Sequence, residues 1–307
     1  MKRIVVQSRH VQERSVGNVF FTKESLAEGP SKSLSLRFWG TRGSLPSPGE
    51  RTVEMGGNTS CVSLEYGRQL MIIDAGSGLR ELGLDLMKRM QSFGSKGAIL
   101  LSHVHWDHVQ GFPFFLPAYV PANEFVICGP KSVRYKLNET LRGQMEPPCF
   151  PVNLSELGAR ISIKELQPTT YRLDGITVKA DINRHPRSDC FSYRVSHNGF
   201  VTTYASDTEH PDEMDVRVLS QAKGADILIY DAQYTPEEYP SKIGWGHSTW
   251  LEGVKIAKRA KAGLLVLFHH DPTSSDEKVR KIEEAAQREF PNTVAAREGM
   301  TIRVTEE

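Results

Sequence analysis

Short apolar runs recur along the chain, and most of them end in a glycine, a proline or a polar residue. Runs of this kind are typical of β-strands. The pattern predicts strands at residues 35–39, 62–66, 69–73, 98–101, 124–128, 161–166, 176–180, 200–204, 226–230 and 264–268, and a strand pair around residues 19–21. Because only two residues separate 62–66 from 69–73, these two strands are expected to form a hairpin.

Helices are predicted between several of these strands. A short amphipathic pattern covers residues 79–90, and a second helix is expected to begin at Ser248, as its N-cap, and to run to about Lys261. Three prolines, Pro113, Pro117 and Pro121, predict a compact loop instead of a long helix in that region.

Alternating strands and helices predict a layered α/β architecture. Both halves of the chain have a similar strand and helix content, and no linker separates them. We therefore expect one domain at residues 34–307, built from two βα halves packed face to face. Residues 1–33 are mixed in character and are interpreted as an N-terminal extension.

The chemistry of the chain is concentrated in residues 100–111. His103, His105, Asp107 and His108 place three imidazoles and one carboxylate within six residues. This spacing cannot put all four side chains on one face of a straight strand or helix, so it predicts a loop wrapped around metal. Imidazole favours Zn²⁺ and related ions, and the carboxylate suggests a second ion beside the first. Solvated loop histidines are the alternative interpretation.

Further polar side chains follow other predicted strands. His185, Asp207, Asp231 and His269 each stand at or just after the end of an apolar run. Strand ends that carry such groups are expected to meet at one edge of a layered fold, where they can complete one site.

Composition narrows the class of protein. Of 307 residues, 24% are charged and 39% hydrophobic, which is typical of a soluble globular protein. The net charge of +1 gives no overall attraction to nucleic acid or an anionic membrane. No run approaches the roughly 18 apolar residues of a membrane helix, and no secretory signal is recognisable. Since the four cysteines contain no C-x-x-C pair, we expect a reduced, cytoplasmic protein.

The pattern H-x-H-x-D-H at 103–108, followed by His185, Asp207 and His269, resembles the metallo-β-lactamase-fold hydrolases over about residues 34–305. The resemblance implies a four-layer αβ/βα sandwich. It also implies two divalent ions, with Zn²⁺ expected and Mn²⁺ or Fe²⁺ as alternatives. By this resemblance His103, His105 and His185 hold one ion. The other is held by Asp107, His108 and His269, and Asp207 bridges the two.

Within that superfamily the chain looks most similar to the ribonuclease Z-type phosphodiesterases. The matching segments are Gly40-Thr41-Arg42-Gly43-Ser44, Asn58-Thr59-Ser60, Phe191-Ser192-Tyr193-Arg194-Val195, Ala205-Ser206-Asp207-Thr208, Tyr230-Asp231-Ala232-Gln233 and Gly246-His247-Ser248-Thr249. Ribonuclease Z enzymes that bind tRNA often insert a long arm before the segment that resembles 205–208. In this chain the stretch between segments 191–195 and 205–208 contains only an ordinary hairpin turn at residues 197–199. The arm is therefore missing there.

The resemblance implies a mechanism in which a metal-bridged hydroxide attacks phosphorus. Asp107 is a candidate to orient that water or take its proton. His247 is the candidate proton donor to the leaving alkoxide, and Asp231 would hold its other ring nitrogen. A capping histidine and a strand-end hydrogen-bonding aspartate are the alternatives. Asn58, Thr59 and Ser60 are candidate phosphate-binding residues, although a simple turn also explains them.

Two further residues have structural interpretations. Asp74 follows a predicted strand. It is expected either to hold the loop that carries the ligands, without being a ligand itself, or to cap a turn. His270 adjoins His269 and is expected only to flank the site, although a register error between the two is conceivable.

The missing arm and the low net charge favour a small phosphodiester, most of all a cyclic nucleotide, over a nucleic acid. One alternative is a ribonuclease Z-like RNA or tRNA 3′ endonuclease. Another is a hydrolase of a carboxyl ester, thioester or lactone, and a third is a metal-stabilised binding module without turnover. No membrane partner is expected, and relatives suggest a homodimer.

Overall fold

The computed structural model describes residues 2–23, 33–89 and 96–306. In these residues the strands form two sheets that pack face to face. The ten-stranded sheet has the order β2-β3-β1-β17-β4-β5-β6-β7-β8-β9. Its strands are β1 (Lys2–Gln7), β2 (Arg14–Val16), β3 (Val19–Thr22), β4 (Ser33–Gly40), β5 (Cys61–Tyr66), β6 (Gln69–Ile73), β7 (Lys96–Leu100), β8 (Glu124–Pro130), β9 (Arg160–Leu166) and β17 (Thr301–Glu306).

The second sheet has seven strands among the described residues, in the order β10-β11-β12-β13-β14-β15-β16. They are β10 (Thr170–Leu173), β11 (Ile176–Ile182), β12 (Phe191–His197), β13 (Phe200–Ala205), β14 (Ile227–Asp231), β15 (Leu264–Phe268) and β16 (Thr293–Ala295). The largest hydrophobic core lies between the two sheets and takes side chains from both, such as Phe38 of β4 and Phe268 of β15.

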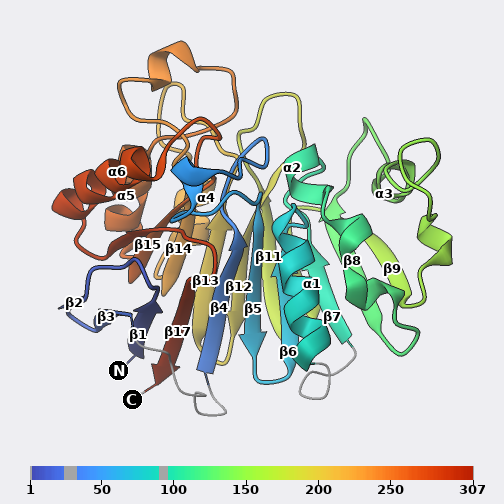
Figure 1. The fold of residues 1–307 in the computed structure, drawn as a ribbon. Helices are drawn as coiled ribbons and strands as arrows, with labels where there is room; N and C mark the ends of the chain where they lie inside the picture. Colours follow the sequence, from blue (N-terminus) through green and yellow to red (C-terminus); the bar gives the residue numbers. More distant parts are fainter. Residues whose placement is uncertain (1, 24–32, 90–95, 307) are drawn as a thin grey trace.

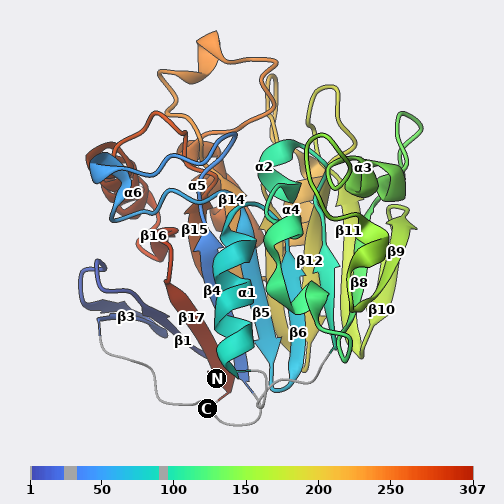
Figure 2. The same ribbon diagram turned by 45° about the vertical axis from the view of Figure 1, so that its right-hand side comes forward.

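Helices cover the outer face of each sheet (Figures 1 and 2). The ten-stranded sheet is covered by α1 (Gly78–Arg89), α3 (Leu137–Gly143) and the short 3-10 turns η2 (Phe112–Phe114) and η3 (Leu116–Tyr119). The seven-stranded sheet is covered by α4 (Val216–Ala222), α5 (Trp250–Ala260) and α6 (Asp276–Glu289). The four-layer αβ/βα sandwich implied by the sequence is therefore confirmed.

Parallel pairing places many strand ends at the same edge. The strands β6 to β9 are parallel to one another, and so are β13 to β16. In Figure 1 the carboxyl ends of these strands point to the top of the molecule. The short helix α2 (Trp106–Val109) and the loop after β14 also lie at this edge.

Most predicted strands are present within one or two residues, including the hairpin of β5 and β6. The 19–21 pair is β2 with β3, and the extension also supplies β1, which pairs with the last strand, β17. Residues 24–32 of the predicted extension and residue 90 of the first predicted helix lie outside the described residues. The division into extension and domain stays a prediction.

One predicted boundary is wrong. The N-cap of α5 is Thr249, whose side chain accepts a hydrogen bond from the Glu252 amide, and not Ser248. The Ser248 hydroxyl is buried and hydrogen-bonds to Tyr230 Oη and His210 Nδ1 instead. Two hydroxyl residues in succession make the sequence ambiguous by one position, and tertiary contacts decide between them.

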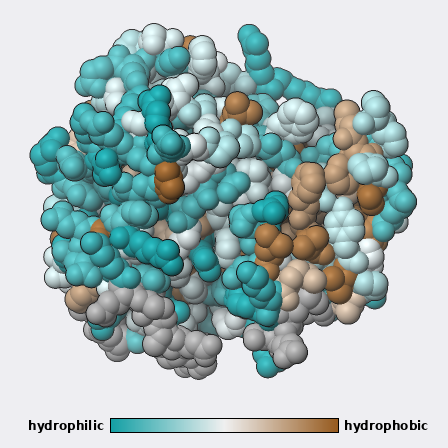
Figure 3. Space-filling model, in the orientation of Figure 1, coloured by the Kyte–Doolittle hydropathy of each residue, from teal (hydrophilic) through white to brown (hydrophobic). Residues whose placement is uncertain are grey.

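The face drawn in Figure 3 is mostly hydrophilic, with hydrophobic residues gathered on the right-hand side over η2 and η3. Phe114 and Leu116 are exposed there. Among the described residues, no helix combines the length and the apolar character that crossing a membrane requires.

Candidate metal centre

The predicted ligands lie together at the carboxyl-end edge of the two sheets. His103, His105, Asp107 and His108 come from the segment between β7 and α2 and from α2 itself. From the other sheet, His185 follows β11, Asp207 follows β13 and His269 follows β15. Asp207 and His269 have positive φ values of 55° and 60°, so each turns sharply away from its strand at the site. Non-glycine residues seldom adopt this conformation, and strain of this kind tends to occur at functional sites.

One group consists of His103, His105 and His185. The ligand atoms of these three side chains all lie within 4.8 Å of one another. His105 Nδ1 is 3.1 Å from His185 Nε2, although the two residues are 80 positions apart in the chain. His103 Nε2 is buried and has no hydrogen-bond partner. Three imidazole nitrogens that converge in this way are a typical binding site for a metal cation.

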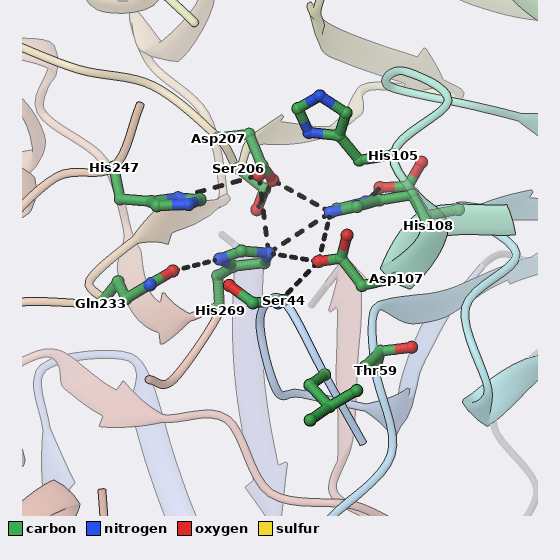
Figure 4. A network of polar contacts seen from close by, with 12 residues as sticks. Ser44, Thr59, His105, Asp107, His108, Ser206, Asp207, Gln233, His247 and His269 are labelled. Carbon is green, nitrogen blue, oxygen red and sulfur yellow. Dashed lines mark hydrogen bonds and ion pairs between the residues drawn. The ribbon is translucent and has the colours of Figure 1, made fainter. Parts of the chain in front are cut away.

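A second group lies beside the first. His108 Nε2 and His269 Nε2 are each 3.2 Å from Asp107 Oδ2. Asp207 lies between the two groups, with its carboxylate oxygens 3.3 Å from His108 Nε2, 3.5 Å from His269 Nε2 and 3.9 Å from His103 Nε2. In Figure 4 the Asp207 carboxylate is in the middle of the cluster.

The opposite nitrogen of each of four histidines is held by the chain. The Nδ1 atoms of His108, His269, His185 and His103 lie 2.8 to 3.0 Å from Asp74 Oδ2, Gln233 Oε1, Gly246 O and Ser102 Oγ respectively. Such contacts fix the orientation of each ring and leave its Nε2 directed at the site. Asp74 also accepts hydrogen bonds from Ser102 and Tyr204, so it supports the ligand loop as expected.

The pKa values divide the histidines into two classes. Burial, reinforced by neighbouring imidazoles, lowers the pKa of His103 well below its usual value and that of His105 to about 4. Burial also lowers the pKa of His185. For His108 and His269, burial is outweighed by nearby carboxylates: the pKa of His108 is raised well above its usual value and that of His269 to about 9.

The two carboxylates in the cluster are anionic. Although burial alone would raise their pKa values, neighbouring histidines dominate and hold the pKa values of Asp107 and Asp207 well below the usual range. Without metal, therefore, two anions are balanced by two imidazolium groups. A pair of divalent cations would replace those protons.

His247 lies against this cluster but outside the predicted ligand set. Its Nδ1 is 3.0 Å from Asp231 Oδ2, and its ring stacks on that of His269 with centres 4.9 Å apart. Asp231 is fully buried and accepts hydrogen bonds from the amides of Asp207, Gln233 and Ser248. Because Asp231 holds Nδ1, the His247 ring has a fixed orientation beside the metal centre (Figure 4).

Three contacts at the site were not predicted. The Ser44 amide donates to Asp107 Oδ2 at 2.7 Å, Gln233 holds His269, and the Gly246 carbonyl faces His185. Two of them use backbone atoms, which leave no side-chain signal in a sequence. Gln233 stands two residues after Asp231, at the end of a buried strand, and that position was the one available signal.

Of the three expected phosphate-binding residues, Asn58 and Thr59 have other side-chain partners, and the buried Ser60 hydroxyl has none. Asn58 bonds to Glu298 and Ser77, while Thr59 is fully buried and exchanges hydrogen bonds with Ser77. Ser60 is also fully buried, and Figure 4 shows Thr59 apart from the polar network. The geometry thus supports the turn interpretation and gives the phosphate-binding interpretation no support.

His270 is directed away from the metal centre. Its ring is buried, and Nε2 lies 2.9 Å from the Ala296 carbonyl oxygen. Burial and the nearby Arg42 lower the pKa of His270 to about 3, so the side chain is neutral. The structure therefore places His269, and not His270, at the site.

The donor set fits metal ions. Alternative groupings place His103 with His108 and Asp207, and place Asp207 with Asp231, His247 and His269, so Asp207 belongs to more than one potential ligand group. Neutral imidazoles, ionised carboxylates and an unpaired buried nitrogen suit Zn²⁺, and the mixed nitrogen and oxygen ligands also accept Mn²⁺ or Fe²⁺.

Comparisons with known proteins agree with this geometry. A family model described as "Beta-lactamase superfamily domain" matches residues 70–270. Ribonuclease Z of Ignicoccus hospitalis is 26% identical over 268 residues, which cover 76% of this chain and 88% of that protein.

Two solved structures share the fold. The metallo-beta-lactamase fold protein YhfI from Bacillus subtilis has a TM-score of 0.66 at 20% identity, covering 88% of this chain and 98% of that one. The short form of human tRNase Z has a TM-score of 0.63 at 22% identity, with coverage of 87% and 98% respectively.

Proposed function

Because the chain belongs to the β-lactamase superfamily and is a metal-dependent hydrolase, we propose that its substrate is a small phosphodiester, with a cyclic nucleotide as the leading candidate. The observation that carries this proposal is the pair formed by His247 and Asp231, 3.0 Å apart beside the cluster. A phosphodiester releases a poor alkoxide leaving group, which needs a proton. A positioned histidine can supply that proton.

We infer that the cluster would hold two ions. His103, His105 and His185 would hold one, and Asp107, His108 and His269 the other, with Asp207 between them. When bound, a pair of divalent ions, with zinc expected, supplies an activated water and positive charge opposite the phosphoryl oxygens.

The chain's own groups then have separate tasks. Asp231 accepts from His247 Nδ1, which leaves Nε2 to carry the proton for the leaving oxygen. Asp107 Oδ2 also accepts from the Ser44 amide, so this carboxylate is held in place while it faces the attacking water. Gln233 and Asp74 keep two ligand rings oriented.

The proposal of a small substrate rests on the connection between β12 and β13. Asn198 and Gly199 alone join these strands, with positive φ values of 47° and 82° that are typical of a tight hairpin turn. No tRNA-binding arm is inserted there. The net charge of +1 likewise provides little attraction for a polyanion.

A ribonuclease Z-like activity on RNA is the second candidate. It is favoured by one observation, the similarity to proteins named ribonuclease Z. Against it, no arm that would support binding of tRNA is inserted between β12 and β13.

One screen distinguishes these candidates. The metal-loaded protein is tested on 2′,3′- and 3′,5′-cyclic nucleotides, cyclic dinucleotides, a precursor tRNA, bis(p-nitrophenyl) phosphate and a panel of lactones. We expect hydrolysis of bis(p-nitrophenyl) phosphate and at least one cyclic nucleotide, and none by an Asp207→Ala control. Cleavage of precursor tRNA alone would support the second candidate, and cleavage of lactones alone would contradict both.

A cytoplasmic location and a homodimer stay predictions. Light scattering of the purified protein tests the homodimer.

A further inference from the structure

The loop between β14 and α5, which contains η5 (Tyr239–Ser241), projects beyond the strand ends above the metal centre (Figures 1 and 2). Near its end lie two large exposed apolar side chains, Ile243 and Trp245, with exposed fractions of 53% and 61%. A surface loop rarely gains stability from an exposed indole. An exposed tryptophan next to the metal centre is suited to contact a ligand that is bound there.

The loop is fixed to the site on two sides. Gly246 O is 2.9 Å from Nδ1 of His185, a predicted metal ligand, and the Gly244 amide bonds to Glu209. The ring of Tyr239 stacks on that of His210, with centres 4.5 Å apart and planes within 4°. Trp245 is thus one residue away from a backbone atom that orients a predicted metal ligand, and contacts on both sides of it hold the backbone of the loop.

Lys242 places a positive charge beside this tryptophan and near Tyr234, whose ring neighbours that of His247. Its Nζ lies 4.1 Å from the centre of the Trp245 ring and 5.8 Å from that of Tyr234. The Tyr234 ring is in turn 6.1 Å from that of His247. Among the described residues, no carboxylate lies within ion-pair distance of Lys242. The ammonium group is therefore available to an anionic ligand.

Trp245 could contact a flat ligand. Lys242 lies over the Trp245 ring, yet Trp245 keeps a large exposed fraction, so part of this residue remains accessible to a ligand. Indole rings stack on any nucleobase, and a neighbouring ammonium group pairs with phosphate. A nucleotide has both features, since its base and its phosphate are joined by a sugar.

We propose that Trp245 and Lys242 bind the nucleotide part of the substrate, with the base stacked on the indole and the phosphate facing the ammonium. The inference rests on the proposed function, because it places the phosphate at the metal centre. On this inference, the loop makes the protein prefer phosphodiesters that carry a nucleoside over those that carry only alkyl groups.

The test compares two chromogenic phosphodiesters, the p-nitrophenyl ester of thymidine 5′-monophosphate and methyl p-nitrophenyl phosphate. Both release p-nitrophenolate, and they differ in whether the other substituent is a nucleoside. We expect Trp245→Ala to raise KM for the nucleoside ester roughly 5- to 150-fold, the range for one lost base stack, without changing KM for the methyl ester. Trp245→Phe should restore most of the loss.

A variant of Lys242 and two control variants complete the comparison. Lys242→Met should raise KM for both esters, because both carry the phosphate. Ile243→Ala, in the same loop, and Lys255→Met, on α5, should change neither. If Trp245→Ala affects both esters equally, or neither, the inference is wrong.

A binding measurement separates failure of this inference from failure of the proposed function. Calorimetric titration of the zinc-loaded protein should show tighter binding of thymidine 5′-monophosphate than of inorganic phosphate, and Trp245→Ala should remove the difference. If the wild-type protein hydrolyses neither ester but shows this difference, the proposed function fails and the binding site stands. Equal binding of the two ligands by the wild-type protein would overturn the inference.

Discussion

Asp231 and His247 are the pair of side chains on which the proposed chemistry depends. The Asp231 carboxylate is buried and takes three amide hydrogen bonds in addition to the histidine contact. Such a carboxylate keeps a fixed position, so it can orient His247 without moving during the reaction.

His247→Ala should reduce kcat on a phosphodiester with an alkoxide leaving group by roughly 10²- to 10⁴-fold, the usual contribution of general acid catalysis. Two metal ions per chain should be retained, because His247 is outside the proposed ligand set. With p-nitrophenolate as leaving group the loss should be much smaller, since that group needs no proton. Equal losses on both substrates would contradict the role of proton donor.

Gln233→Ala removes the hydrogen bond to His269 Nδ1. We expect metal affinity to fall roughly 10- to 100-fold, as is common when a partner of a ligand histidine is lost. Competition with a chromogenic chelator measures this change, and Gln287→Ala, on α6, is the matched control. An unchanged affinity would show that Gln233 does not orient the ligand.

Metal loading should release protons. At pH 7 the metal-free protein holds protons on His108 and His269, whose pKa values are raised, and not on His103 or His105, whose pKa values are lowered. Two bound ions should displace about two protons, and the apparent affinity should rise with pH through the range near pH 9 in which His269 loses its proton. Calorimetry in two buffers of different ionisation enthalpy measures the release, and a value near zero would contradict this charge arrangement.

At this scale the sequence identified the side chains and two carboxylate partners, Asp231 and Asp74, but not the backbone partners. The H-x-H-x-D-H spacing and the polar strand ends were sufficient to select seven residues that the structure brings together. The partners that hold Nδ1 include a backbone carbonyl at Gly246, and Asp107 is held by a backbone amide at Ser44. Backbone groups occur at every residue, so only the folded chain shows which ones are used.

At the scale of elements, strand ends position the site. Asp74 follows β6, Asp207 follows β13 and His269 follows β15, and all three have positive φ values between 55° and 62°. The chain therefore reverses immediately after the strand, which directs the side chain inward. Apolar runs predicted these strands, while the left-handed conformation was not predicted, because Asp and His adopt it more often than most residues but still only rarely.

Other elements were not predicted, and only some of them lack a clear pattern. Strand β10 alternates exposed and half-buried residues, with no fully buried position. Helix α6 buries only four of its fourteen residues, and one of them is Glu283, which pairs with Arg297. Its apolar residues nevertheless lie on one helical face, so the sequence carries an amphipathic pattern there that the prediction missed.

Gly246→Ala should disturb one metal ligand specifically. A Cβ atom at Gly246, whose φ is 89°, would lie 2.2 Å from His185 Nδ1, so the histidine or the loop must move. Gly244→Ala is a matched control, because Gly244 has a φ of 88° with nothing within 4 Å of the added atom. We expect loss of metal from the His185 group only in the first variant, measured as zinc per chain. Equal zinc content in both variants would contradict this role for Gly246.

At the scale of the whole molecule, the centre joins the two halves of the sandwich. Residues 103–108 come from the ten-stranded sheet, whereas His185, Asp207 and His269 come from the other. The hydrophobic core between the sheets holds the halves together and brings these groups close. The sandwich and its shared edge were predictable from the alternation of strands and helices. The pairing of β1 with β17 was not predictable, because these strands come from opposite ends of the chain.

The central claim is that this edge holds two ions, one in each group of ligands. An anomalous difference map at the zinc absorption edge, from crystals of the zinc-loaded protein, tests it most directly. The account predicts two peaks, one among His103, His105 and His185 and one among Asp107, His108 and His269, with Asp207 between them. A map without peaks at these residues, or with a single peak at full occupancy, would contradict it.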